Sequence, residues 1–443
     1  MGNQTKIHHG SSIPHLGGQG GFGIYIHIPF CKQACHYCDF YFSTSLKTKD
    51  DFIEALIKEI SLQQHYLSAP LPPLLKERGT EGVRSIYFGG GTPSLLSADE
   101  IKRILDEIGK YHTVEKDAEI TLEANPDDLT KEKLTGYKEA GITRLSIGIQ
   151  SFADVDLQLM NRAHNSTQAH ECVYIAADSG FTNITVDLIY EIQTLSNEQW
   201  IKNLETAFAL PINHLSCYCL TVEERTPLAD FIKKGKLKNV DDEKASQQFD
   251  ILMKMAADNG FEQYEISNFA RIKSTVHSPQ SPVSTAPDSV HTADCQLPTA
   301  DYTTYYSKHN TSYWLGKKYL GLGPSAHSYD GASRQWNVRN NAQYIEAIKQ
   351  NNVPFEKEIL TPTQKFNEYV MVSLRTIWGV NLEKIKNDFG EKVAEDFYKT
   401  VSTYINDGLV ENPALSGTGA SQNFVLTHKG KFFADKIAGE LFQ

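Results

Sequence analysis

GIYIHIPFCKQACHYCDF, residues 23–40, joins a predicted strand to three closely spaced cysteines. The strand covers 23–28, and Cys31, Cys35 and Cys38 follow it with the spacing C-x3-C-x2-C. Thiolates are soft ligands suited to iron–sulfur clusters, and three on one short loop can surround a four-iron cluster while leaving one iron open to a small molecule. A zinc site is the alternative, but zinc normally takes four protein ligands and no second cysteine pair follows. The spacing therefore favours a cluster.

Short β-rich runs alternate with helical patterns from this stretch to residue 271. The expected strands are 23–28, 84–88, 118–123, 143–149, 184–190 and 214–220, and the expected helices are 50–67, 97–110, 130–140, 153–178, 197–209 and 241–258. Strands separated by helices in this order pair in parallel through right-handed crossovers. The pattern predicts an α/β fold, a partial (β/α)6 barrel over 23–271, with its chemistry at the carboxyl ends of the strands.

The rest of the chain differs in composition from this repeat. Residues 1–22 are polar and Gly-rich and are expected to form a flexible extension, and 272–306 are Ser/Thr/Pro-rich and are expected to form a disordered insertion that includes Cys295. Residues 307–360 are expected to connect the barrel to a small C-terminal α+β domain over 361–443. The C-terminal order of three helices, two short strands and a last helix over 429–442 is typical of a winged helix.

Charge argues against nucleic acid and membrane as main partners. The chain has 443 residues with 43 Lys+Arg and 54 Asp+Glu, a net charge of −11, and a nucleic-acid binder is expected to carry a basic face. No apolar run is long enough to span a bilayer, and the first residues lack the apolar core of a secretory signal. The seven cysteines are an odd number and do not suggest a disulfide scaffold. The sequence predicts a cytoplasmic protein.

Several motifs in addition to the cysteines resemble one known family. They are Tyr25-x-His27-Ile28-Pro29-Phe30-Cys31, Phe88-Gly89-Gly90-Gly91-Thr92-Pro93, Glu123-Ala124-Asn125-Pro126, Ser146-Ile147-Gly148-Ile149-Gln150-Ser151-Phe152 and Asp187-Leu188-Ile189-Tyr190. In this order they resemble the radical S-adenosylmethionine superfamily, and within it the oxygen-independent coproporphyrinogen III oxidase group. The resemblance extends over about residues 23–440.

Two features resemble the heme-chaperone branch of that group, HemW, rather than its oxidase branch. In the oxidases a further cysteine follows the third by one residue, whereas here Cys38-Asp39 leads to Phe40. The chaperone branch carries His-Asn-x-x-Tyr-Trp, which is present as His309-Asn310-Thr311-Ser312-Tyr313-Trp314. From residue types alone, a structural histidine before two packed aromatic residues is the alternative.

The resemblance implies a [4Fe–4S] cluster, S-adenosylmethionine and heme as cofactors. The cluster would be held by Cys31, Cys35 and Cys38. S-adenosylmethionine would contact Tyr25, Tyr37, Gly90, Gly91, Thr92, Glu123, Gln150, Arg162 and Asp187. For heme, His309 would supply an axial nitrogen, and Tyr313 and Trp314 would line a flat apolar face.

Structural alternatives exist for several of these residues. Arg162 falls in the expected helix 153–178, where a surface ion pair is common. A glutamate at a strand end, such as Glu123, is often only solvated, and Tyr25 can pack in the barrel core. Cys217 and Cys219 share a strand face, where small buried side chains are more common than a second metal site.

The expected function is a heme chaperone that delivers heme to acceptor hemoproteins, such as membrane-bound respiratory enzymes. The alternative is an oxygen-independent coproporphyrinogen III oxidase of porphyrin biosynthesis, so whether the chain is an enzyme stays open. A homodimer is compatible with either function. One departure from the family concerns the loop beside Asp187, where the usual Gly-Ile-Pro is replaced by Glu191-Ile192-Gln193. Glycine tolerates a positive φ and proline fixes a bend, so this replacement questions the loop geometry.

Overall fold

The computed structural model describes residues 21–67, 82–273, 303–411 and 423–443. The strands are β1 (Gly21–Ile28), β2 (Gly82–Gly90), β3 (Val114–Ala124), β4 (Arg144–Gln150), β5 (Ile184–Tyr190), β6 (His214–Cys219), β7 (Phe261–Glu265), β8 (Asn268–Lys273), β9 (Thr303–Thr304), β10 (Tyr319–Leu322), β11 (His327–Tyr329), β12 (Ser333–Asn337), β13 (Phe355–Ile359), β14 (Val380–Asn381) and β15 (Asn423–Phe424). The helices are α1 (Lys49–Leu62), α2 (Ala98–Tyr111), α3 (Lys131–Ala140), α4 (Asp154–Leu159), α5 (Ser166–Asp178), α6 (Asn197–Ala209), α7 (Pro227–Lys233), α8 (Asp242–Asp258), α9 (Lys308–Trp314), α10 (Asn341–Lys349), α11 (Pro362–Leu374), α12 (Leu382–Phe389), α13 (Glu391–Asn406), α14 (His428–Lys431) and α15 (Ala434–Glu440), with short 3-10 turns η2 (Pro93–Leu95) and η3 (Pro126–Asp128).

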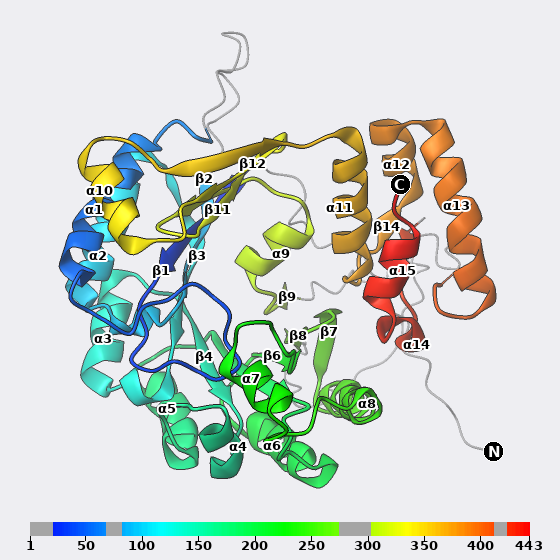
Figure 1. Ribbon diagram of the computed structural model, residues 1–443, viewed down its shortest axis with the longest axis horizontal. Coiled ribbons are helices and arrows are strands. Elements are labelled where there is room, and N and C mark those ends of the chain that lie inside the picture. Colours follow the sequence, from blue (N-terminus) through cyan, green and yellow to red (C-terminus); the bar gives the residue numbers. More distant parts are fainter. Residues whose placement is uncertain (1–20, 68–81, 274–302, 412–422) are drawn as a thin grey trace, which may run out of the picture.

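One large mixed sheet organises the described residues from Gly21 to Ile359. Its strand order is β13-β12-β11-β10-β1-β2-β3-β4-β5-β6-β8-β7. The strands from β10 through β1 to β6 pair in parallel, and antiparallel strands extend the sheet at both ends. Within the described residues β7 and β13 do not pair, so the sheet curves without closing. Figure 1 shows helices α1 to α6 and α8 in an arc outside this curved sheet.

The six predicted strands are all present, and the predicted α/β fold is confirmed. Central strands are buried on both faces and therefore consist mostly of apolar residues, such as Ile24, Ile26 and Ile28 in β1, all with no exposed surface. Most of the described helices begin at a capping side chain. For example, α2 begins with a capping box in which Ser97 and Glu100 each accept a hydrogen bond from the other's backbone N–H.

The predicted helix over 153–178 is wrong, because the chain forms two helices there. α4 ends at Leu159 and α5 begins at Ser166. Asn161 adopts a positive φ of 56°, which ends the first helix, and the side chain of Asn165 accepts from Gln168 N–H to cap the second. The predicted last helix over 429–442 is also divided, into α14 and α15.

Residues 307–360 do more than connect two domains. They add β10 to β13 to the large sheet, and β10 pairs in parallel with β1, which places it beside the first strand of the chain. Most of the predicted insertion 272–306, including Cys295, lies outside the described residues, as does most of the predicted extension 1–22. The two ends of the insertion pair with each other, since Ile272 and Lys273 of β8 lie opposite β9.

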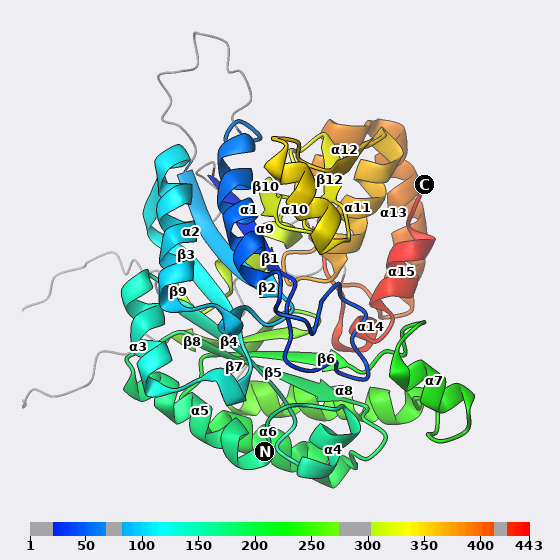
Figure 2. The ribbon, with the colours of Figure 1, turned by 60° about the vertical axis from the view of Figure 1, so that its left-hand side comes forward.

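The C-terminal domain has its own hydrophobic core. Its buried residues include Phe366, Val370, Phe397, Phe424 and Ile437. Helices α11 to α13 and α15 surround the short sheet β14–β15, and a bridge between Val410 and Leu426 continues this pairing. Figure 2 shows these helices grouped on one side of the molecule. In the described part of the chain, no helix is both long and apolar enough to cross a bilayer.

Helix α9 lies inside the curve of the sheet and joins it to the C-terminal domain (Figure 1). It contacts β1 and β2 on one side and α11 on the other. This short helix therefore separates the interior of the partial barrel from the junction between the two domains.

Candidate functional site

A cavity of about 520 Å³ opens where the parallel strands end at their carboxyl side. Its wall includes eleven of the residues predicted for the cluster and the nucleotide: Cys31, Cys35, Tyr37, Cys38, Gly90, Gly91, Thr92, Glu123, Gln150, Arg162 and Asp187. These residues come from five different strand ends and from the loops that follow them. Parallel strands bring their carboxyl ends to one edge, so residues far apart in sequence meet there.

The three motif cysteines lie on the loop after β1 and are all partly exposed to this cavity. The N–H of Cys31 donates to Ser43 C=O at 3.0 Å, which ties the start of the loop to residues beyond it. Burial raises the pKa of the Cys31 and Cys38 thiols to about 11. A bound metal ion or cluster reverses this effect, because its positive charge stabilises the thiolate.

The donor set fits a multi-iron cluster. Three thiols face one cavity, and no disulfide links them. Among the described residues, no three His, Cys, Asp or Glu side chains converge on a point that a single ion could occupy. In a [4Fe–4S] cluster each thiolate binds a different iron, so its ligands surround a volume and need not converge on one ion.

Arg162 braces this cysteine loop. The structure places it between α4 and α5, so its expected position on a helix is wrong, for the reason given above. Its guanidinium donates to the Sγ of Cys35 at 3.3 Å and to the hydroxyl of Tyr37 at 3.4 Å. On its other side it donates to Asn125 Oδ1 at 2.7 Å and to Gly148 C=O at 2.8 Å. The side chain thus fixes the cysteine loop to the ends of β3 and β4.

The glycine run after β2 requires residues without side chains. Gly90 has a φ of 106°, and an added Cβ would lie 2.6 Å from the ring of His27. A Cβ at Gly91 would lie 2.6 Å from the carbonyl oxygen of Phe30. The backbone beside Cys31 is therefore close-packed, and the N–H of Thr92 donates to the same Phe30 carbonyl at 2.7 Å.

Glu123 at the end of β3 is the central carboxylate of the cavity. It accepts from the hydroxyl of Tyr87 at 2.8 Å and from Gly90 N–H at 3.2 Å. Burial raises its pKa to about 7, the Tyr87 hydrogen bond opposes this rise, and the nearby Asp187 adds to it. Asp187 has a pKa raised by burial to about 6, and Ser146 donates to it. The two carboxyl groups thus titrate close to neutral pH.

The loop that follows Asp187 keeps a backbone geometry normally reserved for glycine. Glu191 adopts a φ of 64°, and its N–H donates to Gln248 Oε1 at 2.7 Å. Its buried carboxylate accepts from Asp241 N–H at 2.8 Å and lies 3.6 Å from Lys244 Nζ. These contacts offset the strain of a non-glycine residue at positive φ. The replacement of the family's glycine is therefore accommodated.

Tyr25 is the one predicted nucleotide contact that lies off the cavity wall. It is half-buried inside the partial barrel, where its ring stacks on Tyr87 at 6.2 Å between centroids. Its hydroxyl lies 3.2 Å from Nδ1 of His27. Tyr25 thus contacts Tyr87, the residue whose hydroxyl donates to Glu123.

The predicted heme residues lie on α9, on the side of the partial barrel away from the cysteines. His309 is 1% exposed and stacks on Tyr87 with centroids 5.0 Å apart. Its Nδ1 lies 2.9 Å from Ser85 Oγ and its Nε2 2.8 Å from the hydroxyl of Tyr313. Burial lowers the pKa of His309 to about 3, so the ring is neutral. Both ring nitrogens are engaged by protein groups, and the axial-ligand role of His309 stays a prediction.

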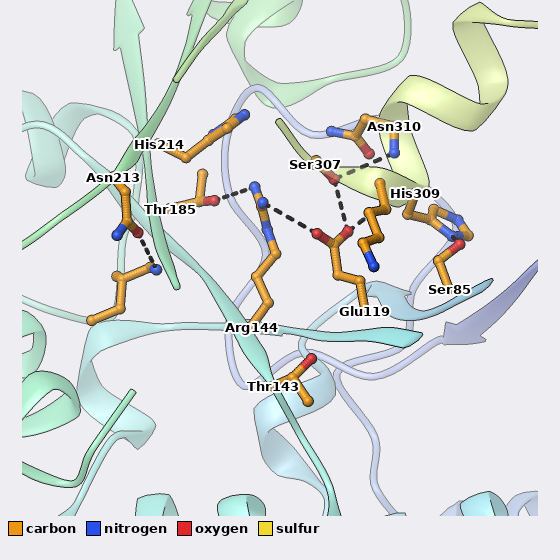
Figure 3. Close-up of polar contacts among 12 residues, drawn as sticks. Ser85, Glu119, Thr143, Arg144, Thr185, Asn213, His214, Ser307, His309 and Asn310 are labelled. Carbon is orange, nitrogen blue, oxygen red and sulfur yellow. Dashed lines mark hydrogen bonds and ion pairs between the residues drawn. The ribbon is translucent and has the colours of Figure 1, made fainter. Parts of the chain in front are cut away.

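Helix α9 is held in place by a buried ion pair (Figure 3). Oε1 of Glu119 accepts from Ser307 Oγ at 3.2 Å and from His309 N–H at 3.1 Å, at the first turn of the helix. Its other oxygen lies 3.6 Å from Nη1 of Arg144, and Nη2 of the same side chain donates to the hydroxyl of Thr185. A carboxylate at a helix start stabilises the free N–H groups there. Glu119 thereby fixes the position of both His309 and Tyr313.

Some cavity residues were not predicted. Arg144, Ser146, Ser216, Tyr218 and Asn310 lie on its wall. Two of them could have been identified from the sequence. Side chains alternate between the two faces of a strand, so Ser216 and Tyr218 of β6 lie on the opposite face from the buried Cys217. Asn310 belongs to α9, a helix that the sequence pattern does not reveal. Cys219 also lies on the wall, at the end of the same strand.

Two family models match separate parts of the chain. The radical SAM superfamily matches residues 25–207, which hold the cysteine loop and β1 to β5. The HemN C-terminal domain matches residues 360–433, which form most of the second domain. Together they cover most of the cavity wall and helix α11, which packs beside α9.

Relatives align over nearly the whole chain. Heme chaperone HemW of Bacillus subtilis is 30% identical over 419 residues, covering 94% of this chain and 97% of that protein. Heme chaperone HemW of Lactococcus lactis is 30% identical over 88% of this chain and 90% of that protein. Among solved structures, coproporphyrinogen III oxidase (HemN) of Escherichia coli superposes with a TM-score of 0.72 at 22% identity, over 96% of this chain and 91% of that one, and so shares its fold. By its sequence similarity to these relatives, the chain belongs to the heme chaperone HemW family of the radical SAM superfamily.

Proposed function

We propose that this chain binds heme and delivers it to acceptor hemoproteins, and that it holds a [4Fe–4S] cluster and S-adenosylmethionine in the cavity at the strand ends. The observation that carries the proposal is the alignment with proteins named heme chaperones over nearly the full length of both chains. The acceptors, including the membrane-bound respiratory enzymes expected from the family resemblance, and a homodimeric state belong to the same proposal. A cytoplasmic location is likewise proposed from the sequence.

The cavity supports the cofactor part of the proposal through its own residues. Cys31, Cys35 and Cys38 would each bind one iron, and the open iron would face the glycine run and Glu123. A cluster of this type and the nucleotide, when bound together, supply one-electron chemistry. Glu123 would accept from hydroxyl groups of the nucleotide, and Arg162 would keep Cys35 and Tyr37 in place through the contacts described above.

Heme titration combined with a turnover assay tests the function. Protein purified and reconstituted without oxygen is titrated with hemin, and transfer to an apo-hemoprotein is followed by absorption. We expect about one heme per chain, transfer to the acceptor, and no conversion of coproporphyrinogen III in the presence of S-adenosylmethionine and a reductant. Formation of the divinyl product would support the oxidase alternative. A protein that binds no heme would contradict the proposal.

Binding of S-adenosylmethionine is expected to depend on the charge of Glu123. Replacing Glu123 by Gln removes an anionic acceptor and should weaken binding by about 1–3 kcal/mol. Because the pKa of the Glu123 carboxyl is about 7, the wild type should bind more weakly as pH falls from 8 to 6 and the group takes up a proton. Calorimetry at both pH values measures the change.

The matched control for this prediction is Glu223→Gln, since Glu223 lines the same cavity on the loop after β6. We expect Glu223→Gln to retain the pH dependence of the wild type and Glu123→Gln to lose most of it. Equal affinity of Glu123→Gln and wild type at pH 8 would show that this carboxylate does not contact the nucleotide.

A further inference from the structure

A second cavity, of about 860 Å³, lies between the large sheet and the C-terminal domain. We call it the interdomain cleft. Its walls include Tyr313 and Trp314 of α9, Tyr319 of β10, Arg334 of β12, Tyr369 of α11 and Trp378 after α11. It shares no wall residue with the cysteine-lined cavity, and α9 separates the two. Its volume lies within the usual range of small-molecule sites.

Aromatic rings form much of the cleft wall. The rings of Tyr313 and Tyr319 meet edge to face with centroids 4.6 Å apart, and Tyr329 continues this row 6.3 Å from Tyr319. The facing domain supplies the rings of Tyr369 and Trp378. Opposed aromatic walls suit a flat, conjugated ligand, because such rings attract one another through stacking and edge contacts.

Basic side chains outnumber acidic ones in this wall, although the chain as a whole has a net charge of −11. Lys317, Arg334, Lys365 and Lys384 line the cleft together with only Glu368 and Asp388. The two acids pair with Arg334, at 2.9 Å, and with Lys384. Lys317 and Lys365 form no ion pair with any described residue. Two positive charges are thus available to an anionic ligand.

Three wall residues also carry buried N–H groups without a hydrogen-bond partner in the described part of the chain. These groups are Nε1 of Trp314, Nε1 of Trp378 and Nε of Arg334. Buried donors are nearly always paired, so these three are exceptions. Because the atoms themselves are buried, they lie behind the wall and are not open to the cleft.

We infer that the interdomain cleft is the tetrapyrrole site of this protein, with the macrocycle between the aromatic walls and its two carboxylates toward Lys317 and Lys365. The inference rests on the proposed function, since it names the place where the heme is held. A tetrapyrrole with two propionates combines the three properties that the cleft matches, because it is flat, conjugated and dianionic.

The cleft offers heme iron only tyrosine hydroxyls, so we expect the ring and its carboxylates to account for most of the recognition. None of its described wall residues is a histidine, cysteine or methionine, the usual nitrogen and sulfur ligands of heme iron. His309 lies behind the wall, and its Nε2 is engaged by the hydroxyl of Tyr313 at 2.8 Å. His309 acts here as a positioning residue that fixes the Tyr313 ring.

A filling substitution tests the site in the full-length, reconstituted protein. Val372 of α11 lines the cleft, so Val372→Trp should occupy part of the ligand volume. We expect affinity for both hemin and iron-free protoporphyrin IX to fall by at least about tenfold. The matched control is Met371→Trp on the same helix, because Met371 is 40% exposed and does not line the cleft. This control should bind both ligands as the wild type does.

A second variant keeps the cleft testable even if Val372→Trp does not fold. Reversing both unpaired charges, in Lys317→Glu/Lys365→Glu, should weaken binding of both tetrapyrroles by at least about tenfold, more strongly at low salt. Its control is Lys399→Glu, an exposed position on α13 away from the cleft. Iron content and S-adenosylmethionine affinity should be unchanged in every variant, since the cysteine-lined cavity is separate.

The outcomes separate this inference from the proposed function. A wild type that binds no tetrapyrrole would contradict the proposed function. A wild type that binds, with cleft variants of unchanged affinity, would overturn the cleft alone. Two results together would also overturn the cleft: a loss of affinity of more than about a hundredfold when the iron is removed, and loss of the heme spectrum in His309→Ala. The site would then be assigned to His309.

Discussion

Replacing any one of Cys31, Cys35 and Cys38 by serine is expected to abolish cluster binding. The three thiols are the only cysteines on the loop after β1, and each would bind a different iron. A serine hydroxyl is a harder and weaker ligand for iron than a thiolate. Iron content after reconstitution without oxygen should fall from about four per chain to nearly none, and the broad visible absorption of the cluster should disappear.

The matched control for these variants is Cys172→Ser. Cys172 is 2% exposed on α5, and its thiol donates to the backbone carbonyl of Ala169 within the same helix. A serine can form the same hydrogen bond, so iron content should match the wild type. Zinc in place of iron in protein purified without oxygen, or a variant of Cys35 that still holds four irons, would contradict the cluster assignment.

Replacing Glu59 by alanine is expected to cause the largest loss of stability. This fully buried carboxylate on α1 accepts four hydrogen bonds, from Gln63 Nε2 at 2.8 Å, Asn337 Nδ2 at 2.6 Å, Gly323 N–H at 2.7 Å and the Tyr344 hydroxyl at 2.6 Å. Alanine leaves these buried donors unpaired and opens a cavity. The free energy of unfolding should fall by about 3–5 kcal/mol.

A surface glutamate of the same helix provides the control for Glu59→Ala. Glu54 is paired with Arg103 at 2.6 Å, but both side chains are largely exposed, and such pairs contribute at most about 1 kcal/mol. Denaturant titration followed by circular dichroism compares Glu54→Ala with Glu59→Ala. Equal midpoints for the two variants would show that the buried network adds nothing.

The raised pKa of Glu59 predicts an effect of pH on stability. Burial raises the pKa of Glu59 in the folded protein, so its contribution to stability is greatest below the pKa of an unfolded glutamate and is lost as pH rises through the folded value. Glu59→Gln, which carries no charge at any pH, should therefore show a flatter dependence of its unfolding midpoint on pH than the wild type.

Sequence patterns correctly predicted the six parallel strands and the edge of the sheet at which the cavity opens, because these depend mainly on local sequence. The six parallel strands are long, buried and rich in β-branched residues, so their apolar runs are visible without any knowledge of the fold. The cysteine spacing and the residues at the strand ends identify one edge of a parallel sheet, and eleven predicted residues do meet in one cavity. Asn161 and Asn165 held the signal for the break between α4 and α5, but the apolar spacing on either side concealed it.

Elements that depend on distant contacts were missed. Helix α9 has the polar sequence KHNTSYW and seven residues, too few for a stable isolated helix. It forms because Glu119, about 190 residues earlier, accepts from its first turn. The interdomain cleft combines residues of α9, β10 to β12 and α11, so no single stretch of sequence carries its pattern. The place of Tyr25 beneath the cavity likewise depends on its stacking with Tyr87.

The position of β1 between β2 and β10 has a consequence for synthesis on the ribosome. Ile24 pairs with Ile86 on one side but with Leu320 on the other. At about 5–20 residues per second, β10 emerges about 15–60 s after β1 is complete. During that interval the first strand has one open edge, a state prone to pairing with other chains. Nascent chains that stall before residue 322 should therefore aggregate. The loop after β1 is also completed late, because the hydroxyl of Tyr41 accepts from Asn341 N–H at 2.7 Å.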